Sequence, residues 1–136
     1  MSARSKARKA ALDLLYEGDI RNCSAVKLLE ERRDSLEFLI REYTEILVAG
    51  VVERRERIDE IIAMKAKDWD LDRMPVVDRN ILRLGTYELL WQSDLPEGVA
   101  ISEAVELAKT LSTDDSAVYI NGVLAGVQEI KGDLVI

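Results

Sequence analysis

Four basic side chains near the start of the chain could bind phosphate groups. Arg4, Lys6, Arg8 and Lys9 lie within residues 1–9, here called the basic arm, which contain no acidic residue. In a helix, Arg4 and Arg8 share one face and the two lysines flank it. Such a group could neutralise several phosphates of a nucleic-acid strand. An N-terminus that only aids solubility has the same pattern, so the arm alone leaves both interpretations open.

The remainder of the chain is acidic, which restricts where a nucleic acid could bind. The net charge is −7, from 19 basic and 26 acidic residues. Without the four cations of the arm, 15 basic residues face 26 acidic ones, a net charge of −11. Because phosphates are attracted to the arm and repelled elsewhere, the sequence predicts a confined site rather than a broad basic face.

The side chains that enzymes use most often are scarce. The chain has no histidine, the commonest general base and metal ligand, and its lone Cys23 cannot form an intrachain disulfide or a cysteine-based zinc site. No phosphate-binding glycine loop, dinucleotide fingerprint or supported carboxylate pair occurs. We therefore expect no enzymatic activity, cofactor or metal. Because no apolar run has the length of a membrane span or signal peptide, we expect a cytoplasmic protein without a membrane partner.

A second candidate surface lies towards the C-terminus. Asp115, Tyr119 and Gly122 share one face of an expected helix, with Gly126 one turn further. The tyrosine ring could stack on an unpaired base. Close packing of a neighbouring helix is the favoured explanation of the two glycines. For Asn121, a hydrogen bond inside the core is favoured over contact with a base edge.

Other charged residues are expected to pair within the fold. Glu88 and Glu103 lie in apolar surroundings, where they could be buried partners of arginines. Residues 53–60 mix three arginines with four acids. This mixture favours a solvated helix face with salt bridges over an RNA-binding patch.

Hydrophobic periodicity predicts an all-α fold of six to seven helices that would position these residues. No segment has the alternation of a strand. The first two expected helices are 3–18 and 25–33, and Ser24 caps the second. A long helical segment follows, which Asp34 and Glu37 open as a capping box and which ends near residue 62; it is either one helix bent near Arg54 or two helices joined there. The last three expected helices are 75–92, 100–111 and one that runs from a cap at Ser112–Asp115 to about residue 129.

The helix expected over 75–92 differs from the others because it is apolar on nearly every side. A helix of this kind is buried at the centre of a fold. Arg79 and Arg83 form its main basic edge, and residues 66–75 are expected to connect two halves of the molecule.

Three blocks of the sequence resemble the NusB family of transcription antitermination factors. They are PVVDRNILRLGTYELL at 75–90, VAISEAVELAK at 99–109 and DDSAVYINGVL at 114–124. The segment Arg4–Tyr16 also looks like the arginine-rich start of that family. The blocks follow the family's order over nearly the whole chain, which makes the resemblance specific.

The resemblance implies a single domain, 1–136, made of two three-helix-bundle halves at about 1–65 and 75–130. It implies binding to the boxA element of nascent RNA as a heterodimer with NusE, a small-subunit ribosomal protein. Such complexes join RNA polymerase and suppress premature termination, above all in ribosomal RNA operons. A free member of the family could also form a homodimer through the surface that NusE covers.

The resemblance also assigns roles to particular residues. Tyr16, Ile20 and Asp78 match positions that face NusE, and Asp115 matches an acid at the edge of the RNA and NusE surfaces. The residues expected to contact RNA are Arg4, Lys6, Arg8, Lys9, Arg83 and Tyr119.

The arm departs from the family's richest versions. Ser5 stands where arginine is common, and Lys6 replaces an arginine. Lysine lacks the bidentate fork of arginine, so a second RNA-binding subunit is expected to complete the surface.

Two alternatives remain. The RNA-binding domain of an RNA cytosine methyltransferase resembles this fold, but no strand, glycine loop and helix for a methyl donor follow residue 130 here. A helical adaptor that binds only proteins would have an incidental basic arm. Binding to boxA-like RNA, with and without NusE, would distinguish these alternatives.

Overall fold

The computed structural model describes residues 2–35 and 39–136, and all regular structure in those ranges is helical. This confirms the all-α prediction. The helices are α1 (Ala3–Arg21), α2 (Ala25–Arg33), α3 (Glu42–Lys65), α4 (Val76–Trp91), α5 (Glu97–Leu111) and α6 (Asp114–Ile130), with 3₁₀ turns at Leu71–Arg73 and Lys131–Asp133.

The first helix begins and ends at well-defined caps. The Ser2 hydroxyl accepts a hydrogen bond from the Ser5 backbone N–H at 3.0 Å. At the other end Asn22 adopts the left-handed conformation, with φ 54°, and closes the helix one turn beyond the expected end at residue 18. Gly18 makes this turn possible, because a Cβ there would lie 2.8 Å from the Cys23 carbonyl oxygen.

The start of α3 differs from the prediction. Asp34 ends α2 and does not open α3, and residues 39–41 are not helical. Glu37, the other member of the expected capping box, lies outside the described residues. The helix continues through Arg54 without division, and the guanidinium of Arg54 lies 5.2 Å from the centre of the Trp91 ring. The long stem of an arginine can cover apolar surface there in place of an apolar residue.

The central helix is α4, as the sequence predicted. Residues 80–90 are all buried, and α4 contacts α1, α3, α5 and α6. It packs tightly against α3 at Gly50, where a Cβ would lie only 2.2 Å from Cζ of Tyr87. The tyrosine ring therefore occupies the space that a side chain at residue 50 would need.

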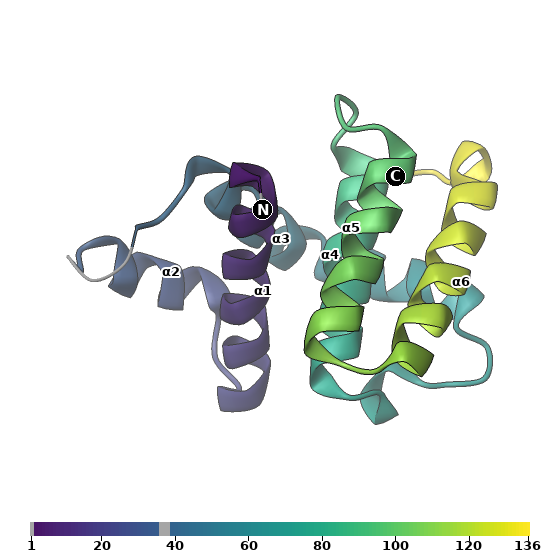
Figure 1. Ribbon diagram of the computed structural model, residues 1–136, viewed down its shortest axis with the longest axis horizontal. Coiled ribbons are helices and arrows are strands. Elements are labelled where there is room, and N and C mark those ends of the chain that lie inside the picture. The colour runs from purple at the N-terminus through teal and green to yellow at the C-terminus, as the bar shows by residue number, and fades with distance from the viewer. Residues whose placement is uncertain (1, 36–38) are drawn as a thin grey trace.

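The two three-helix halves meet at α4. Helices α1–α3 contact one another, as do α4–α6. The halves are joined by α4, which contacts α1 and α3, and by a further contact between α3 and α6. Figure 1 shows α1 and α2 on one side of the molecule and α5 and α6 on the other. As expected, α6 begins at a local cap: the Thr113 hydroxyl accepts a hydrogen bond from the Ser116 backbone N–H at 2.9 Å.

None of the described helices combines the length and the apolar character that crossing a bilayer demands.

Candidate nucleic-acid interface

The basic arm forms the first two turns of α1, and three of its cations reach solvent. Arg4 and Lys6 are exposed and Lys9 is half-buried. The Arg4 guanidinium lies 4.5 Å from the centre of the Tyr43 ring and 3.5 Å from the Asp94 carboxylate. Lys9 pairs with Asp13 one turn further along, at 2.7 Å. Exposed pairs of this kind contribute little to stability, so these cations can exchange partners at low cost.

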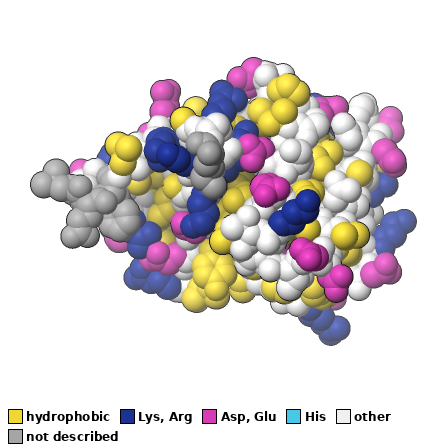
Figure 2. Space-filling model, viewed as in Figure 1, with side chains coloured by type: hydrophobic (Ala, Val, Ile, Leu, Met, Phe, Trp, Pro, Cys, Tyr) yellow, Lys and Arg dark blue, Asp and Glu magenta, His cyan; other side chains and the backbone are white. Residues whose placement is uncertain are grey.

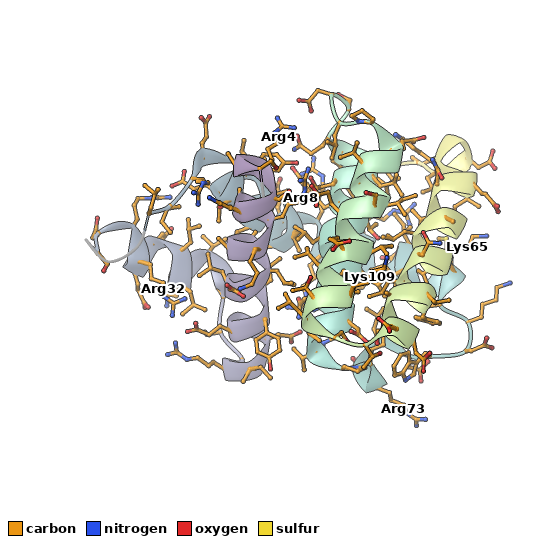
Figure 3. The ribbon with its side chains drawn as sticks, viewed as in Figure 1. Arg4, Arg8, Arg32, Lys65, Arg73 and Lys109 are labelled. Atoms are coloured by element: carbon orange, nitrogen blue, oxygen red, sulfur yellow. The ribbon has the colours of Figure 1, made fainter. Side chains whose placement is uncertain are left out.

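Arg8 has a different position. Figure 3 shows it on the side of α1 that faces α4 and α5. Its side chain is 3% exposed, its Nε lies 2.8 Å from the Glu88 carboxylate, and its Nη1 lies 3.1 Å from Glu103. The prediction that Glu88 and Glu103 pair with an arginine is therefore confirmed.

The surroundings of Arg8 keep it charged. Burial would lower the pKa of Arg8, but the hydrogen bond and the charge of Glu88 outweigh burial and raise it. Tyr43 also donates its hydroxyl to Glu88, and burial together with that bond raises the pKa of Tyr43. RNA contact by Arg8 remains an untested prediction, whereas its contacts here connect α1 to α4 and α5.

Arg83 is also held by carboxylates. Its side chain is 5% exposed, with Nη1 3.0 Å from Asp19 and Nε 2.8 Å from Asp59. Asp19 lies 15 residues after Arg4 on α1, and a helix rises about 1.5 Å per residue, so some 22 Å separate this cluster from the arm. The geometry does not bring Arg83 into the same patch as the arm.

Charges elsewhere on the surface are mixed. In the face drawn in Figure 2, basic and acidic side chains are interspersed over both halves. The run at 53–60 forms surface salt bridges as predicted, among them Arg57 to Glu60 at 3.2 Å and Arg55 to Asp59 at 3.9 Å. This distribution agrees with a local nucleic-acid site.

Tyr119 lies in the second turn of α6 and is half-buried. Its ring packs edge-on against Trp69, with the ring centres 5.5 Å apart. Among the described residues its buried hydroxyl has no hydrogen-bond partner, and burial and the charge of Asp68 raise the pKa of Tyr119. Trp69 was predicted only as part of the connector. Its aromatic side chain in a polar connector was the available signal that it packs against another element.

Two predictions for this helix are wrong. Asn121 is exposed, so it makes no buried hydrogen bond in the core. Gly122 faces open space, with no described atom within 4 Å of a Cβ placed there. Only Gly126 has the expected close neighbour, because the Lys65 stem would lie 2.9 Å from its Cβ. Exposed surface beside Tyr119 therefore extends over Gly122, one turn further along α6.

The residues expected to face the protein partner are divided between surface and interior. Tyr16 is 42% exposed and Ile20 is 56% exposed, both unusual for large apolar side chains. Asp115 is exposed in the first turn of α6. Asp78 is buried and accepts a hydrogen bond from the Ser116 hydroxyl at 2.6 Å, so it fastens α4 to the start of α6.

Tyr16 borders a hollow of about 360 Å³, which we call the α1–α4 groove. Its lining is mostly apolar and consists of Leu12, Asp13, Tyr16, Pro75, Val76, Val77 and Leu111. Apolar side chains that are left accessible around a groove are typical of a protein-binding surface.

In the described part of the chain, possible metal-ligating side chains form no group of three or more that could hold an ion.

Comparisons with known proteins agree with this architecture. The NusB family model matches residues 5–129. The transcription antitermination protein NusB of Pseudarthrobacter chlorophenolicus is 52% identical over 134 residues, covering 98% of each chain. The structure of NusB from T. maritima superposes with a TM-score of 0.83 at 32% identity, covering 98% of this chain and 99% of that one.

A further similar structure contains partners. The antitermination factors NusB and NusE have been solved in complex with dsRNA. The matching chain has a TM-score of 0.79 and 30% identity, covering 93% of this chain and 96% of its own length.

Proposed function

The chain belongs to the NusB family of antitermination factors, and from that premise we propose that it binds boxA RNA together with NusE and joins an RNA polymerase antitermination complex. The observation that carries the proposal is the similarity to the solved complex of NusB, NusE and dsRNA over 93% of this chain. The proposed role is binding, without a catalytic step.

On the RNA side, we assign phosphate contact to the exposed cations of the arm. Arg4, Lys6 and Lys9 are accessible on the first turns of α1 and can release their weak surface partners. Phosphate contacts supply affinity without sequence preference, so base recognition must come from other groups. Tyr119 and the open surface beside it are our candidates for stacking.

Arg8 and Arg83 have a different part in this proposal. To reach RNA, each would have to leave carboxylates that neutralise it inside the protein. Removing one partner of a buried ion pair leaves an uncompensated charge, which is strongly unfavourable. We therefore assign both arginines to positioning α1 against α4, which holds the arm in place.

On the protein side, we propose that NusE covers the α1–α4 groove. Tyr16 and Ile20 supply exposed apolar surface on α1, and Asp115 adds a charge at the start of α6. Asp78 acts through its bond to Ser116, which positions that turn of α6.

Fluorescence anisotropy with a boxA-like RNA and a scrambled RNA tests the function, with and without NusE. We expect preferential binding of the boxA-like RNA and a gain in affinity when NusE is added. Binding of neither RNA under either condition would reject the RNA function and favour the protein-binding adaptor. Binding of a methyl donor would favour the methyltransferase-related alternative.

A variant at Ile20, one turn along α1 from the groove residue Tyr16, makes the experiment specific. Ile20→Glu places a charge on exposed apolar surface of α1, so the gain from NusE should fall while binding of RNA alone is kept. Val135→Glu is the matched control, because Val135 is an 88% exposed apolar residue that belongs to neither of the proposed binding surfaces. Equal effects of the two variants would argue against the groove as the NusE surface.

A further inference from the structure

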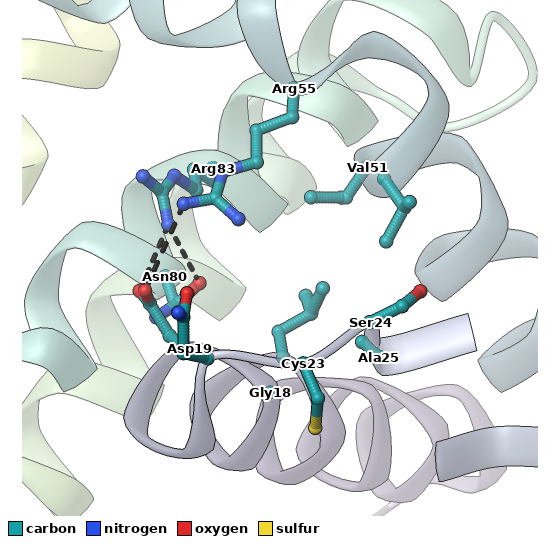
Figure 4. Close-up of a pocket in the computed structure, with 12 residues that line it drawn as sticks. Gly18, Asp19, Cys23, Ser24, Ala25, Val51, Arg55, Asn80 and Arg83 are labelled. Atoms are coloured by element: carbon teal, nitrogen blue, oxygen red, sulfur yellow. Dashed lines mark hydrogen bonds and ion pairs between the residues drawn. The ribbon is translucent and has the colours of Figure 1, made fainter. Parts of the chain in front are cut away.

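A second pocket lies in the N-terminal half, away from the residues assigned to RNA and NusE. It has a volume of about 420 Å³ and lies where the end of α1, the start of α2, and parts of α3 and α4 meet. Figure 4 shows its open centre between Arg55 and Arg83 on one side and Cys23 and Ser24 on the other. We call it the α1–α3 pocket.

The walls of the α1–α3 pocket have two kinds of surface. Leu15, Val51 and Val52 provide apolar side chains, and Arg55 and Asn80 are among the polar ones. Small-molecule sites commonly combine an apolar lining with a few polar groups that fix orientation, within volumes of roughly 300–1,000 Å³. The pocket has both the size and the mixed lining of such a site.

The charged groups beside the pocket form one cluster in which the arginines are held unequally. Among the described residues, the guanidinium groups of Arg55, Arg79 and Arg83 share the carboxylates of Asp19 and Asp59. Arg79 and Arg83 hold these acids at 2.8–3.0 Å, whereas Arg55 is 3.8 Å from Asp19 and 3.9 Å from Asp59. The side chain of Arg55 is 51% exposed, so Arg55 is the loosely paired cation that a ligand in the pocket can reach.

Asp19 contributes its negative charge at neutral pH. Burial would raise the pKa of Asp19, but hydrogen bonds from Arg79 and Asn80 and the charge of Arg83 outweigh burial and lower it to about 2. The charge of Asp72 also raises the pKa of Arg79, so three carboxylates act on the three arginines, and Arg55 is the arginine that holds them least closely. A ligand with a single negative charge would pair with Arg55.

The start of α2 adds a favourable dipole to the same place. Ser24 and Ala25 line the pocket, and within the described part of the chain the Ser24 side chain makes no cap hydrogen bond. The first N–H groups of a helix lack intrahelical partners and favour a nearby anion. The N-terminus of this nine-residue helix therefore favours a negatively charged ligand, as Arg55 does.

We propose that the α1–α3 pocket binds a small organic carboxylate, with the carboxylate on Arg55 and the apolar body against Leu15, Val51 and Val52. Guanidinium groups pair well with carboxylates. A phosphate dianion would fit less well because its second charge would have no further loosely paired arginine and would lie near Asp19 and Asp59. The pocket contains no arm residue and no Tyr119, so this binding does not depend on the proposed RNA function.

The test is an NMR titration of the full chain with hexanoate, using hexanol and hexylamine as controls of similar shape. We expect saturable shifts of the Ser24, Ala25 and Val51 amides with hexanoate, at a dissociation constant of about 1 mM or below. Hexanol should bind at least about tenfold more weakly, because a charge-assisted bond is absent. Hexylamine should not bind.

Matched variants test whether Arg55 is the group that binds the carboxylate of hexanoate. Arg55→Gln should weaken hexanoate at least about tenfold. Arg54→Gln should leave binding unchanged, since Arg54 points to Trp91. Ser24→Asp adds a cap oxygen that suits the start of α2 and places a negative charge at the pocket, so the protein should stay folded and bind hexanoate more weakly.

Three results would overturn the proposal. The first is the absence of saturable shifts at the pocket, and the second is equal binding of hexanol and hexanoate. The third is an equal loss in the Arg54→Gln and Arg55→Gln variants. Tighter binding of inorganic phosphate than of hexanoate at the same amides would replace the carboxylate assignment with a phosphate one.

Discussion

Nε of Arg8 donates to both carboxylate oxygens of Glu88, at 2.8 and 2.9 Å, in an ion pair whose side chains are 3% and 2% exposed. The two residues are 80 positions apart, so the pair joins the first helix to the central one. Tyr43 donates to the same carboxylate, and the Arg8 Nη1 reaches Glu103. A buried ion pair is tolerated only where additional hydrogen bonds of this kind offset the cost of removing both charges from water. One residue of the basic arm is therefore part of the core.

The first prediction concerns the stability supplied by this pair. Arg8→Ala leaves the Glu88 charge buried without its partner, so the free energy of unfolding should fall by about 3–5 kcal/mol. Arg4→Ala removes only a surface interaction and should lower it by less than about 1 kcal/mol. Urea denaturation followed by circular dichroism measures both.

The double variant Arg8→Met, Glu88→Leu is the control, since it replaces both charges with apolar groups. It should recover much of the stability that Arg8→Ala loses. Similar, small losses for Arg4→Ala and Arg8→Ala would contradict a structural role of Arg8.

The second prediction concerns the exposed cations of the arm. Removing one phosphate contact from single-stranded RNA should reduce the log–log salt slope of binding by about 0.7 in magnitude. We expect this change for Lys6→Ala, measured by fluorescence anisotropy at several salt concentrations. Lys27→Ala, on the exposed face of α2, is the matched control and should leave the slope unchanged. An unaltered slope for Lys6→Ala would show that this lysine does not touch phosphate.

The third prediction separates the ring of Tyr119 from its hydroxyl. Stacking requires only the ring, so Tyr119→Ala should weaken RNA binding by about 1–3 kcal/mol while Tyr119→Phe should bind as the parent does. The hydroxyl is buried without a partner among the described residues, so Tyr119→Phe should also keep or raise stability. Equal losses of RNA affinity in both variants would instead indicate a hydrogen bond from the hydroxyl to RNA.

The fourth prediction concerns acid. The pKa of Asp19 is about 2 in the folded protein, below its ordinary value of 3.8, so its ionised form stabilises the fold. That contribution is complete above the ordinary value and is lost as the pH falls through about 2. One pKa unit corresponds to about 1.4 kcal/mol, so the loss should be about 2 kcal/mol.

Urea denaturation between about pH 5 and pH 2 measures this contribution. Asp19→Asn should lower stability at neutral pH and should show less additional loss over the acid range. A parallel acid dependence in Asp19→Asn and the parent protein would exclude Asp19 as its source.

Local patterns predicted the helices well where the determinants are close in sequence. The apolar character of α4 on nearly every side predicted its central burial. At the start of α6, the Thr113 hydroxyl accepts a hydrogen bond from the backbone N–H of Ser116, only three residues away. The start of α3 was missed because Asp34 has the side chain of an N-cap and yet ends α2. The type of a capping residue does not determine whether that residue ends the preceding helix or begins the next one.

The candidate site depended on contacts that the sequence does not encode locally. The spacing of Arg4 and Arg8 correctly placed them on one face of a helix, but only the tertiary fold brings Glu88 to Arg8 and leaves Arg4 at the surface. For the same reason Asn121 could not be distinguished from a buried amide. Its neighbours on α6 are apolar, whereas its own position faces solvent.

The fifth prediction compares two glycines inside helices. Gly122 faces open space, so Gly122→Ala adds a methyl group that meets no described atom, and it should raise the free energy of unfolding by about 1 kcal/mol through helix propensity. Gly50 lies against the Tyr87 ring, so Gly50→Ala should lower it by about 1–3 kcal/mol despite the same gain in propensity. Thermal or urea denaturation measures the two changes, which should have opposite signs. Destabilisation by Gly122→Ala would show that another element packs on this part of α6, and the assignment of this open surface to RNA would then be wrong.

The same variant also tests RNA binding. If a base stacked on Tyr119 covers Gly122, Gly122→Ala should weaken RNA binding while it stabilises the protein.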